Sequence, residues 1–422
     1  MRSTRAFAWT GRSLRTEPEE NPVNAPLKLD TPVERIRAFH KELADIRHDI
    51  HAHPELGFTE QRTSDLVAAK LQSWGVEVHR GLAKTGLVGV IKGNRSSSGR
   101  AIGLRADMDC LPMHELGNMP YKSVNAGCMH ACGHDGHTTM LLGAGRYLAE
   151  TRNFDGTAYL IFQPAEEGGG GGRVMIEEGL FERFPANEVY ALHNWPSLPP
   201  GKIAVRPGPV MAATDDFKIT VKGRGGHGAM PHLSVDPVVI TAHIITALQT
   251  IASRNVSPVD AVVVSLCSMQ TSQLGANNVI PDAVHLCGTI RSFRAETRDL
   301  AEKRFKEIIT GVANAMGGSA QIEYHRNYPA TVNTEREARF AAQVGRRIFG
   351  AENVITDADP TMGGEDFSYM LQVRPGAYVF LGQGGGPMSC FLHNPNYDFN
   401  DDVIPMGAGY LAALVEESLP IK

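Results

Sequence analysis

From about Asp30 onward, short apolar runs alternate with stretches of helical periodicity. Apolar runs that end in polar residues predict buried strands at 101–109, 157–167 and 188–195, and a 3.6-residue period predicts helices between them at 137–150 and 172–184. Strands and helices in this alternation are typical of an α/β domain with a largely parallel sheet.

Four ionisable residues stand near the ends of these predicted strands, namely Asp107, Glu166, Glu167 and His193. The carboxyl ends of parallel strands meet at one edge of a sheet, and sites in such sheets gather there. We therefore expect these four side chains to converge on one crevice although they lie far apart in the sequence.

The order of elements changes after residue 212. The pattern predicts, in order, strand 216–223, helix 236–253, strands 261–269 and 283–293, helix 297–317 and strand 320–327. This βαββαβ order is that of a compact ferredoxin-like unit that is able to fold on its own. We therefore expect an inserted second domain over residues 213–326.

Residues 327–422 resume the first pattern, with helices at 335–350 and 406–418 around a strand at 376–383. The first domain is thus predicted to be discontinuous, formed by 27–212 and 327–422 around a mixed, largely parallel sheet. Residues 1–26 begin Arg-rich and end Pro-rich without an apolar core segment or clean helical periodicity, so we expect a flexible leader.

Composition limits the class of protein. The chain has 422 residues, 42% hydrophobic and 21% charged, with a formal net charge of −5, which is ordinary for a soluble globular protein and gives no reason to expect nucleic acid or an anionic membrane as a partner. Apolar runs such as AVVVSLC have the length of a strand, well below the roughly 20 residues that cross a bilayer. Six cysteines spread over so long a chain favour a reducing cytoplasm over a disulfide framework.

The stretch HACGHDGH, residues 130–137, concentrates potential metal ligands. Cys132 and His134 are spaced so that both are able to reach one ion. A structural zinc site usually pairs short cysteine or histidine spacings, and the chain has no Cys-x-x-Cys pair for such a site or for redox chemistry. A catalytic thiol would need a separate base and a group that orients that base. Taken alone, this stretch leaves its role open.

The motif PAEEGG places two adjacent carboxylates, Glu166 and Glu167, at the end of a predicted buried strand. Neighbouring side chains at a strand end splay apart, so one is able to bind a metal ion while the other faces a substrate. Metal-assisted hydrolysis needs both roles, because an unligated carboxylate takes a proton from the activated water and passes it to the leaving amine.

Two further histidines have comparable contexts, His193 at a predicted strand end and His393 just before the last helix. Singly, each is more often a hydrogen-bonded structural histidine. Together with Cys132, His134 and Glu167 they supply five ligands of mixed type, enough for two divalent ions with positions left for water and substrate. The combination favours a catalytic dinuclear site.

These residues belong to a series of nine motifs in a fixed order: HDIHAHPELGFTE, LRADMDCLP, MHACGHDGH, PAEEGG, ALHNWP, GRGGHGAMPH, NVIPD, GTIRSF and GGEDFS. From about Thr31 to the end, the chain resembles the hippurate hydrolase and indole-acetyl-amino-acid amidohydrolase family. That family is a branch of the dinuclear aminoacylase/carboxypeptidase superfamily. The resemblance implies a catalytic α/β domain interrupted by a ferredoxin-like lid that often mediates dimerisation, in agreement with the order of elements above.

The resemblance also implies site residues. It makes Cys132, His134, Glu167, His193 and His393 the ligands of two divalent ions, with Glu166 as general base. Many relatives carry a histidine where this chain has Arg105, and Cys132 replaces their bridging aspartate. We hypothesise that Asp107 orients a ligand from behind. The thiolate suits zinc but also permits manganese or cobalt, so the identity of the metal stays open.

Three lid residues match the family's substrate contacts. His227 resembles the lid histidine that polarises the scissile carbonyl, often from a partner subunit, although a surface histidine in a glycine loop is the alternative. Asn278 and Arg291 resemble the groups that hold the substrate carboxylate, and an Arg fork suits a carboxylate. A structural ion pair is the alternative for Arg291.

Other residues of the motifs are expected to be structural. His51 and His53 lie at a predicted helix end before Pro54, which favours packing and capping. His137 is expected to face the helix that it begins, and Cys110, where alanine is usual, to be a small buried apolar residue.

The sequence thus predicts a metal-dependent amidohydrolase that cleaves N-acyl amino acids, hippurate-like substrates first, and that forms a homodimer or higher oligomer through its lid. Within the same superfamily the alternatives are an auxin-conjugate hydrolase, an N-acetyl-diaminopimelate deacetylase and a dipeptidase. A non-catalytic binding protein stabilised by metal is the alternative from another class, and the presence of Glu166 beside a full ligand set argues against it.

Overall fold

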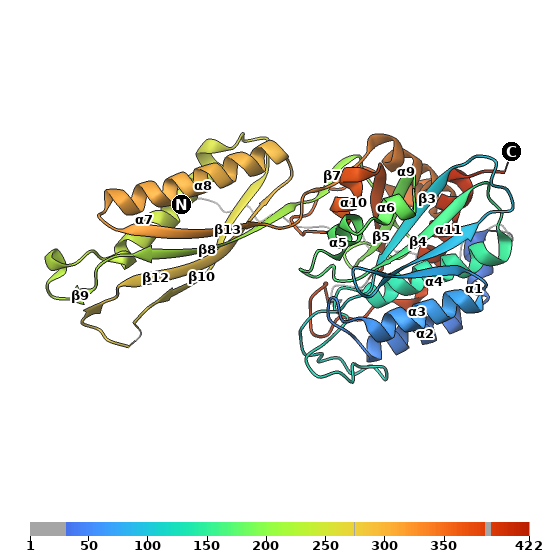
Figure 1. The fold of residues 1–422 in the computed structure, drawn as a ribbon, viewed down its shortest axis with the longest axis horizontal. Helices are drawn as coiled ribbons and strands as arrows, with labels where there is room; N and C mark the ends of the chain where they lie inside the picture. The colour runs from blue at the N-terminus through green and yellow to red at the C-terminus, as the bar shows by residue number, and fades with distance from the viewer. Residues whose placement is uncertain (1–30, 274, 385–389, 422) are drawn as a thin grey trace, which may run out of the picture.

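The computed structural model describes residues 31–273, 275–384 and 390–421. The predicted leader, residues 1–26, lies outside these ranges. The described chain forms two lobes, a larger one built on a mixed sheet and a smaller, elongated one that extends from it (Figure 1).

The larger lobe contains an eight-stranded sheet of order β1-β2-β4-β3-β5-β16-β6-β15. β3 runs parallel to β4 and β5, and β16 runs parallel to β5, whereas β1, β2 and β6 introduce antiparallel pairs. The α/β class with a mixed, largely parallel sheet is therefore confirmed. The strands are β1 (Glu77–Leu82), β2 (Gly86–Lys92), β3 (Ala101–Asp107), β4 (Thr157–Gln163), β5 (Glu188–Trp195), β6 (Ile203–Ala204), β15 (Val354–Ile355) and β16 (Gly376–Gly382).

Helices cover both faces of this sheet, so the central strands are buried on both sides, and every residue of β3 and β16 is buried. One face packs against α1 (Pro32–Arg37), α2 (His40–Ala52), α3 (Gln61–Ser73), α4 (His134–Thr151), α9 (Glu335–Phe349) and α11 (Ile404–Ser418). The other face packs against α5 (Gly171–Glu177), α6 (Leu180–Arg183) and α10 (Phe367–Val373).

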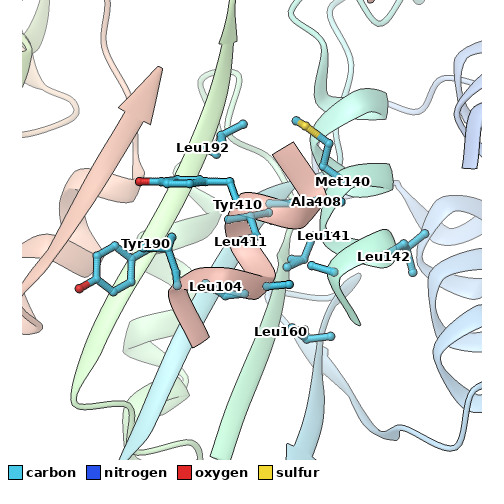
Figure 2. Close-up of a cluster of buried hydrophobic side chains, with 14 of the residues drawn as sticks. Leu104, Met140, Leu141, Leu142, Leu160, Tyr190, Leu192, Ala408, Tyr410 and Leu411 are labelled. Atoms are coloured by element: carbon cyan, nitrogen blue, oxygen red, sulfur yellow. The ribbon is translucent and has the colours of Figure 1, made fainter. Parts of the chain in front are cut away.

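The larger core lies between the sheet and the pair α4 and α11 (Figure 2). Leu141 of α4 and Leu411 of α11 pack with Leu104 of β3 and Leu160 of β4. Each fully buried leucine contributes about 1.5–3 kcal/mol to the stability of the fold. This packing fixes α4 against β3 and β4, and the amino end of α4 carries the motif HACGHDGH.

The smaller lobe is the predicted ferredoxin-like unit. Its four-stranded antiparallel sheet has the order β10-β12-β8-β13, and its core is separate from the two cores of the larger lobe. Its elements are β8 (Ala213–Lys222), α7 (Pro237–Leu248), β10 (Val262–Thr271), β12 (Ala283–Ser292), α8 (Ala295–Ala315) and β13 (Ser319–Arg326). The βαββαβ fold is confirmed, and the domain limits 27–212, 213–326 and 327–422 stay predictions.

Two predicted helices differ in detail. The helix expected over 172–184 is divided into α5 and α6 because Gly179 adopts a left-handed conformation with φ of 88°. Of the helix expected over 236–253, the α-helical part ends at Leu248, and a short π-helix follows over Ile251–Asn255.

Short strands complete the chain. In the lid, β9 (Gly226–His227) pairs with β11 (Val279–Ile280), and at the junction of the lobes β7 (Gly208–Met211) pairs with β14 (Thr331–Asn333). Within the described part of the chain, no helix combines the length and apolar character needed to cross a membrane.

Candidate metal centre

The predicted ligands come together at the carboxyl edge of the large sheet. His193 lies on β5, Glu167 follows β4, and Cys132 and His134 lie at the amino end of α4. His393 comes from the segment that precedes α11 and takes an uncommon positive φ of 62°. The geometry of the parallel strands explains why residues from such distant segments meet.

The donor atoms form overlapping groups, within each of which they lie at most 4.8 Å apart. One group is Cys132, His134 and His193, and another is Cys132, Glu167 and His393. The Cys132 sulfur lies 3.5 Å from His193 Nε2, and His393 Nε2 lies 3.2 Å from Glu167 Oε1. Cys132 belongs to both groups, which is the position that a bridging ligand between two ions would occupy.

One unpartnered atom in this cluster fits metal ligation. His134 Nε2 is buried and has no hydrogen-bond partner among the described residues, whereas Glu167 Oε1 faces His393 Nε2. The other nitrogen of each buried imidazole is engaged: His134 Nδ1 lies 2.9 Å from the Asp109 carbonyl oxygen, and His193 Nδ1 lies 2.7 Å from that of Asn194. Donation from Nδ1 leaves the Nε2 lone pair facing the cluster, as a metal-binding histidine requires.

The charges around the cluster are also those of a cation site. Burial raises the pKa of the Cys132 thiol, with a further contribution from Glu167. Hydrogen bonds with Cys132 and Glu167 raise the pKa of His393 to about 10. Both shifts favour the protonated forms of these groups, and a divalent cation would replace such protons, because metal ligands bind in their deprotonated form.

Gly133, between the ligands Cys132 and His134, is required by its surroundings. It takes a left-handed φ of 100°, and a Cβ there would lie 2.4 Å from Asn194 Oδ1 and 2.8 Å from the Tyr397 hydroxyl. Only glycine allows the chain to turn into α4 so close to β5.

Glu166 is buried beside the cluster, and it forms a group with His134 and Glu167. Burial raises its pKa well above the usual range, and the carboxylates of Glu365 and Glu167 raise it further. The Asp109 carboxylate accepts hydrogen bonds from the backbone N–H groups of Glu166 (3.0 Å) and Glu167 (2.8 Å), which holds the main chain of these two residues in place. Ala165, just before them, has a strained φ of 54°.

Asp107 lies against the cluster but contacts it differently from our hypothesis. Its carboxylate is 2.6 Å from His137 Nδ1 and 2.7 Å from Arg105 Nη1, and it lies 3.7 Å from His134 Nε2. No hydrogen bond joins it to any of the five predicted ligands within the described residues. A role for Asp107 in orienting a ligand stays a prediction, whereas Asp109 holds His134 directly.

A pair of acidic residues beside Glu166 was not predicted from the sequence. Glu365 and Asp366 each lie 2.9 Å from Arg105 Nη2, and together with Glu166 they form one further group of potential ligands. Arg105 therefore contacts three buried carboxylates, including Asp107, and offsets part of their charge. The motifs RAD and GGEDFS contained this signal, but no local pattern indicated that they face each other.

The predicted lid residues divide between two places. Arg291 lines a cavity of about 630 Å³ that also contains Cys132, Glu166, Glu167, His193 and His393. Its Nη1 atom is buried without a partner among the described residues, and burial lowers the pKa of the guanidinium. Asp216 and Asp215 partly offset the charge of this half-buried guanidinium, and its Nη1 atom is suited to an anionic ligand.

His227 and Asn278 lie together elsewhere. They line a separate cavity of about 380 Å³ in the lid, and the Asn278 carbonyl oxygen accepts a hydrogen bond from Gly228 N at 2.7 Å. Figure 1 shows β9, which contains His227, at the end of the lid remote from the larger lobe. Within one chain these two side chains do not reach the metal centre.

The remaining histidines of the motifs lie in the supporting structure. His51 is buried between Asp135 and Glu115, and His53 contacts the Asp49 carbonyl oxygen at the end of α2. His137 does not face only its own helix, because its Nε2 lies 2.6 Å from Asn194 Oδ1 on β5. Cys110 is buried, as expected.

The fold and this centre define a metal-dependent amidohydrolase. A family model described as Peptidase family M20/M25/M40 matches residues 103–417. The chain belongs to this family.

Relatives and solved structures agree. The chain is 43% identical over 373 residues to hippurate hydrolase of Campylobacter jejuni. This alignment covers 88% of the chain and 95% of the relative. It is 38% identical over 391 residues to IAA-amino acid hydrolase ILR1-like 4 of Arabidopsis thaliana, covering 90% and 86%. The crystal structure of the Bacillus subtilis YXEP protein, described as a dinuclear metal-binding peptidase of the M20 family, aligns with a TM-score of 0.78 at 32% identity, covering 91% and 99%.

Proposed function

We propose that this enzyme hydrolyses the amide bond of N-acyl amino acids. Hippurate-like compounds are the first candidates for its substrate. The observation that carries the proposal is Glu166, a buried carboxylate directly beside the ligand cluster. The relatives, which include a hippurate hydrolase and an IAA-amino acid hydrolase, support the substrate class.

Cys132, His134, Glu167, His193 and His393 would hold two divalent ions, manganese, zinc or cobalt. Divalent ions bound there lower the pKa of water towards about 7 and polarise a carbonyl. Glu166 accepts the proton of the attacking water and later delivers it to the leaving nitrogen. A raised pKa suits a group that takes and returns a proton near neutral pH.

Arg291 is proposed to bind the carboxylate of the amino-acid half, because it lines the same cavity as Glu166 and its Nη1 atom has no hydrogen-bond partner in the described part of the chain. His227 is proposed to donate a hydrogen bond to the developing oxyanion, and Asn278 to help hold the substrate carboxylate. Since neither of these two residues reaches the centre of its own chain, we propose a homodimer in which the lid of the partner supplies them.

The cysteines support a cytoplasmic location, since all six are free thiols. Within the superfamily, an auxin-conjugate hydrolase, an N-acetyl-diaminopimelate deacetylase and a dipeptidase stay alternative substrate assignments. N-benzoylglycine, N-acetyl-diaminopimelate, an indole-acetyl amino acid and a dipeptide, assayed with Mn, Zn and Co after chelator treatment, would rank them and identify the metal.

The variant Glu166→Gln tests the mechanism. It preserves size and hydrogen bonding but removes proton transfer, so turnover of N-benzoylglycine should fall about 100- to 10,000-fold. Metal content should stay at the wild-type level. Full activity in this variant would remove Glu166 from the mechanism, and Glu177→Gln, an exposed glutamate on α5, is the matched control.

A further inference from the structure

The cavity that contains the metal centre has side chains of two kinds. The lid contributes polar groups, among them Asp216 and Arg291, whereas the larger lobe contributes the apolar side chains Trp195, Phe391 and Leu392. Of these, Arg291 has a proposed partner in the substrate carboxylate. The apolar side chains have no role in the chemistry described above, and no motif of the sequence indicated one for them.

Each of the two aromatic residues lies two positions from a proposed metal ligand in the sequence. Trp195 follows His193 by two residues on β5, and side chains two residues apart in a strand share one face. Phe391 precedes His393 by two residues. The ring centroids of Trp195 and His193 are 6.3 Å apart, so the aromatic pair adjoins the ligand cluster.

Trp195 and Phe391 meet edge to face, with centroids 5.3 Å apart and an interplanar angle of 89°. Phe380 is buried on the neighbouring strand β16. Its ring centroid lies 4.5 Å from that of Trp195, so it supports Trp195 from within the fold. Among the described residues no second ring supports Phe391 in this way, and 47% of it is exposed. A large apolar side chain exposed at the rim of a site is available to cover an apolar ligand.

We propose that Trp195 and Phe391 form the subsite for the acyl group and select an aromatic acyl group such as benzoyl. The inference rests on the proposed function. With the scissile carbonyl at the metal cluster and the carboxylate on Arg291, the acyl group is the remaining part of the substrate. Trp195 and Phe391 form a pair of apolar rings next to the cluster, whereas the hydroxyl of Tyr328, which lines the same cavity, donates to the Glu166 carbonyl oxygen. A third ring extends the edge-to-face arrangement, which aromatic groups prefer, whereas an acetyl group is too small to cover either ring.

The test compares N-benzoylglycine with N-acetylglycine in the metal-loaded enzyme. In Phe391→Ala, kcat/KM for N-benzoylglycine should fall about 10-fold, mainly through KM, while that for N-acetylglycine changes less than about 2-fold. Phe391→Tyr should retain the wild-type ratio of the two values. Val259→Ala, at a lid residue that is 88% exposed and outside the cavity, is the control. An equal fall for both substrates, or no fall for N-benzoylglycine, would overturn the inference.

A binding measurement gives a second readout that does not depend on turnover. In the Glu166→Gln background, adding Phe391→Ala should weaken the Kd of N-benzoylglycine about 10-fold in isothermal titration calorimetry. An unchanged Kd would contradict the subsite. Failure of the proposed function has a different signature, since a wild-type enzyme that hydrolyses neither substrate with Mn, Zn or Co refutes that function. A wild-type enzyme with the higher kcat/KM for N-acetylglycine refutes the aromatic subsite alone.

Discussion

The imidazole Nδ1 of His134 lies 2.9 Å from the main-chain carbonyl oxygen of Asp109. The carboxylate of Asp109 meanwhile accepts the backbone N–H groups of Glu166 and Glu167. Asp109, which follows β3, therefore contacts a proposed ligand at the start of α4. It also holds the backbone of the two glutamates that follow β4.

The variant Asp109→Ala keeps the main-chain carbonyl beside His134 but removes the carboxylate that accepts the backbone N–H groups of Glu166 and Glu167, so it should loosen the position of these two residues. Outer partners of metal ligands commonly contribute 10- to 100-fold to affinity, so we expect metal binding to weaken by about that factor. Titration of the chelator-treated protein with Zn²⁺ or Mn²⁺ measures the change. Asp65→Ala, at an exposed acid of α3, should bind metal as the wild type does. Wild-type affinity in Asp109→Ala would mean that the ligands are held by other contacts.

Much of the fold was predictable because its signals are local. The strands of β3, β4 and β5 are short apolar runs, and the βαββαβ order of the lid follows directly from the periodicity. The ends of the elements were less predictable. The left-handed backbone of Gly179 separates α5 from α6, and the sequence pattern did not show that this glycine would leave the helical conformation.

The site divides in the same way. The ligands Cys132 and His134, and the pair Glu166 and Glu167, occur in compact motifs. Asp109 and Phe391 contribute through contacts with residues 25 positions or more away, so no local pattern indicates them. Assigning His227 to the site depended on the family resemblance, and its place at the remote end of the lid is a property of the tertiary fold.

Complementation between two inactive variants tests the shared site. Glu166→Gln and His227→Ala should each be nearly inactive alone. In a mixture refolded or co-expressed at equal amounts, half of the dimers are mixed and one of their two sites is intact, so about a quarter of wild-type activity should return. Activity that stays at the level of the separate variants would show that His227 does not act across subunits.

Stability should depend on pH through His51. Burial opposes its charge, but hydrogen bonds with Asp135 and Glu115 raise its pKa to about 9 from 6.5. A raised folded-state pKa stabilises the protein fully below pH 6.5, and this contribution is lost as the pH rises through about 9. Between pH 6 and 9.5 the wild type should lose more unfolding free energy than His51→Gln, by on the order of 3 kcal/mol, measured by urea denaturation. Parallel losses in the two proteins would assign the pH dependence to other groups.

The most direct measurement is the number of metal ions bound per chain, determined by elemental analysis after dialysis. Because Cys132 belongs to both donor groups, the wild type should hold two divalent ions and Cys132→Ser clearly fewer, whereas Cys267→Ser, at an exposed lid cysteine, should hold two. Two ions retained in Cys132→Ser, or none in the wild type at saturating metal, would contradict a dinuclear centre built around this thiolate.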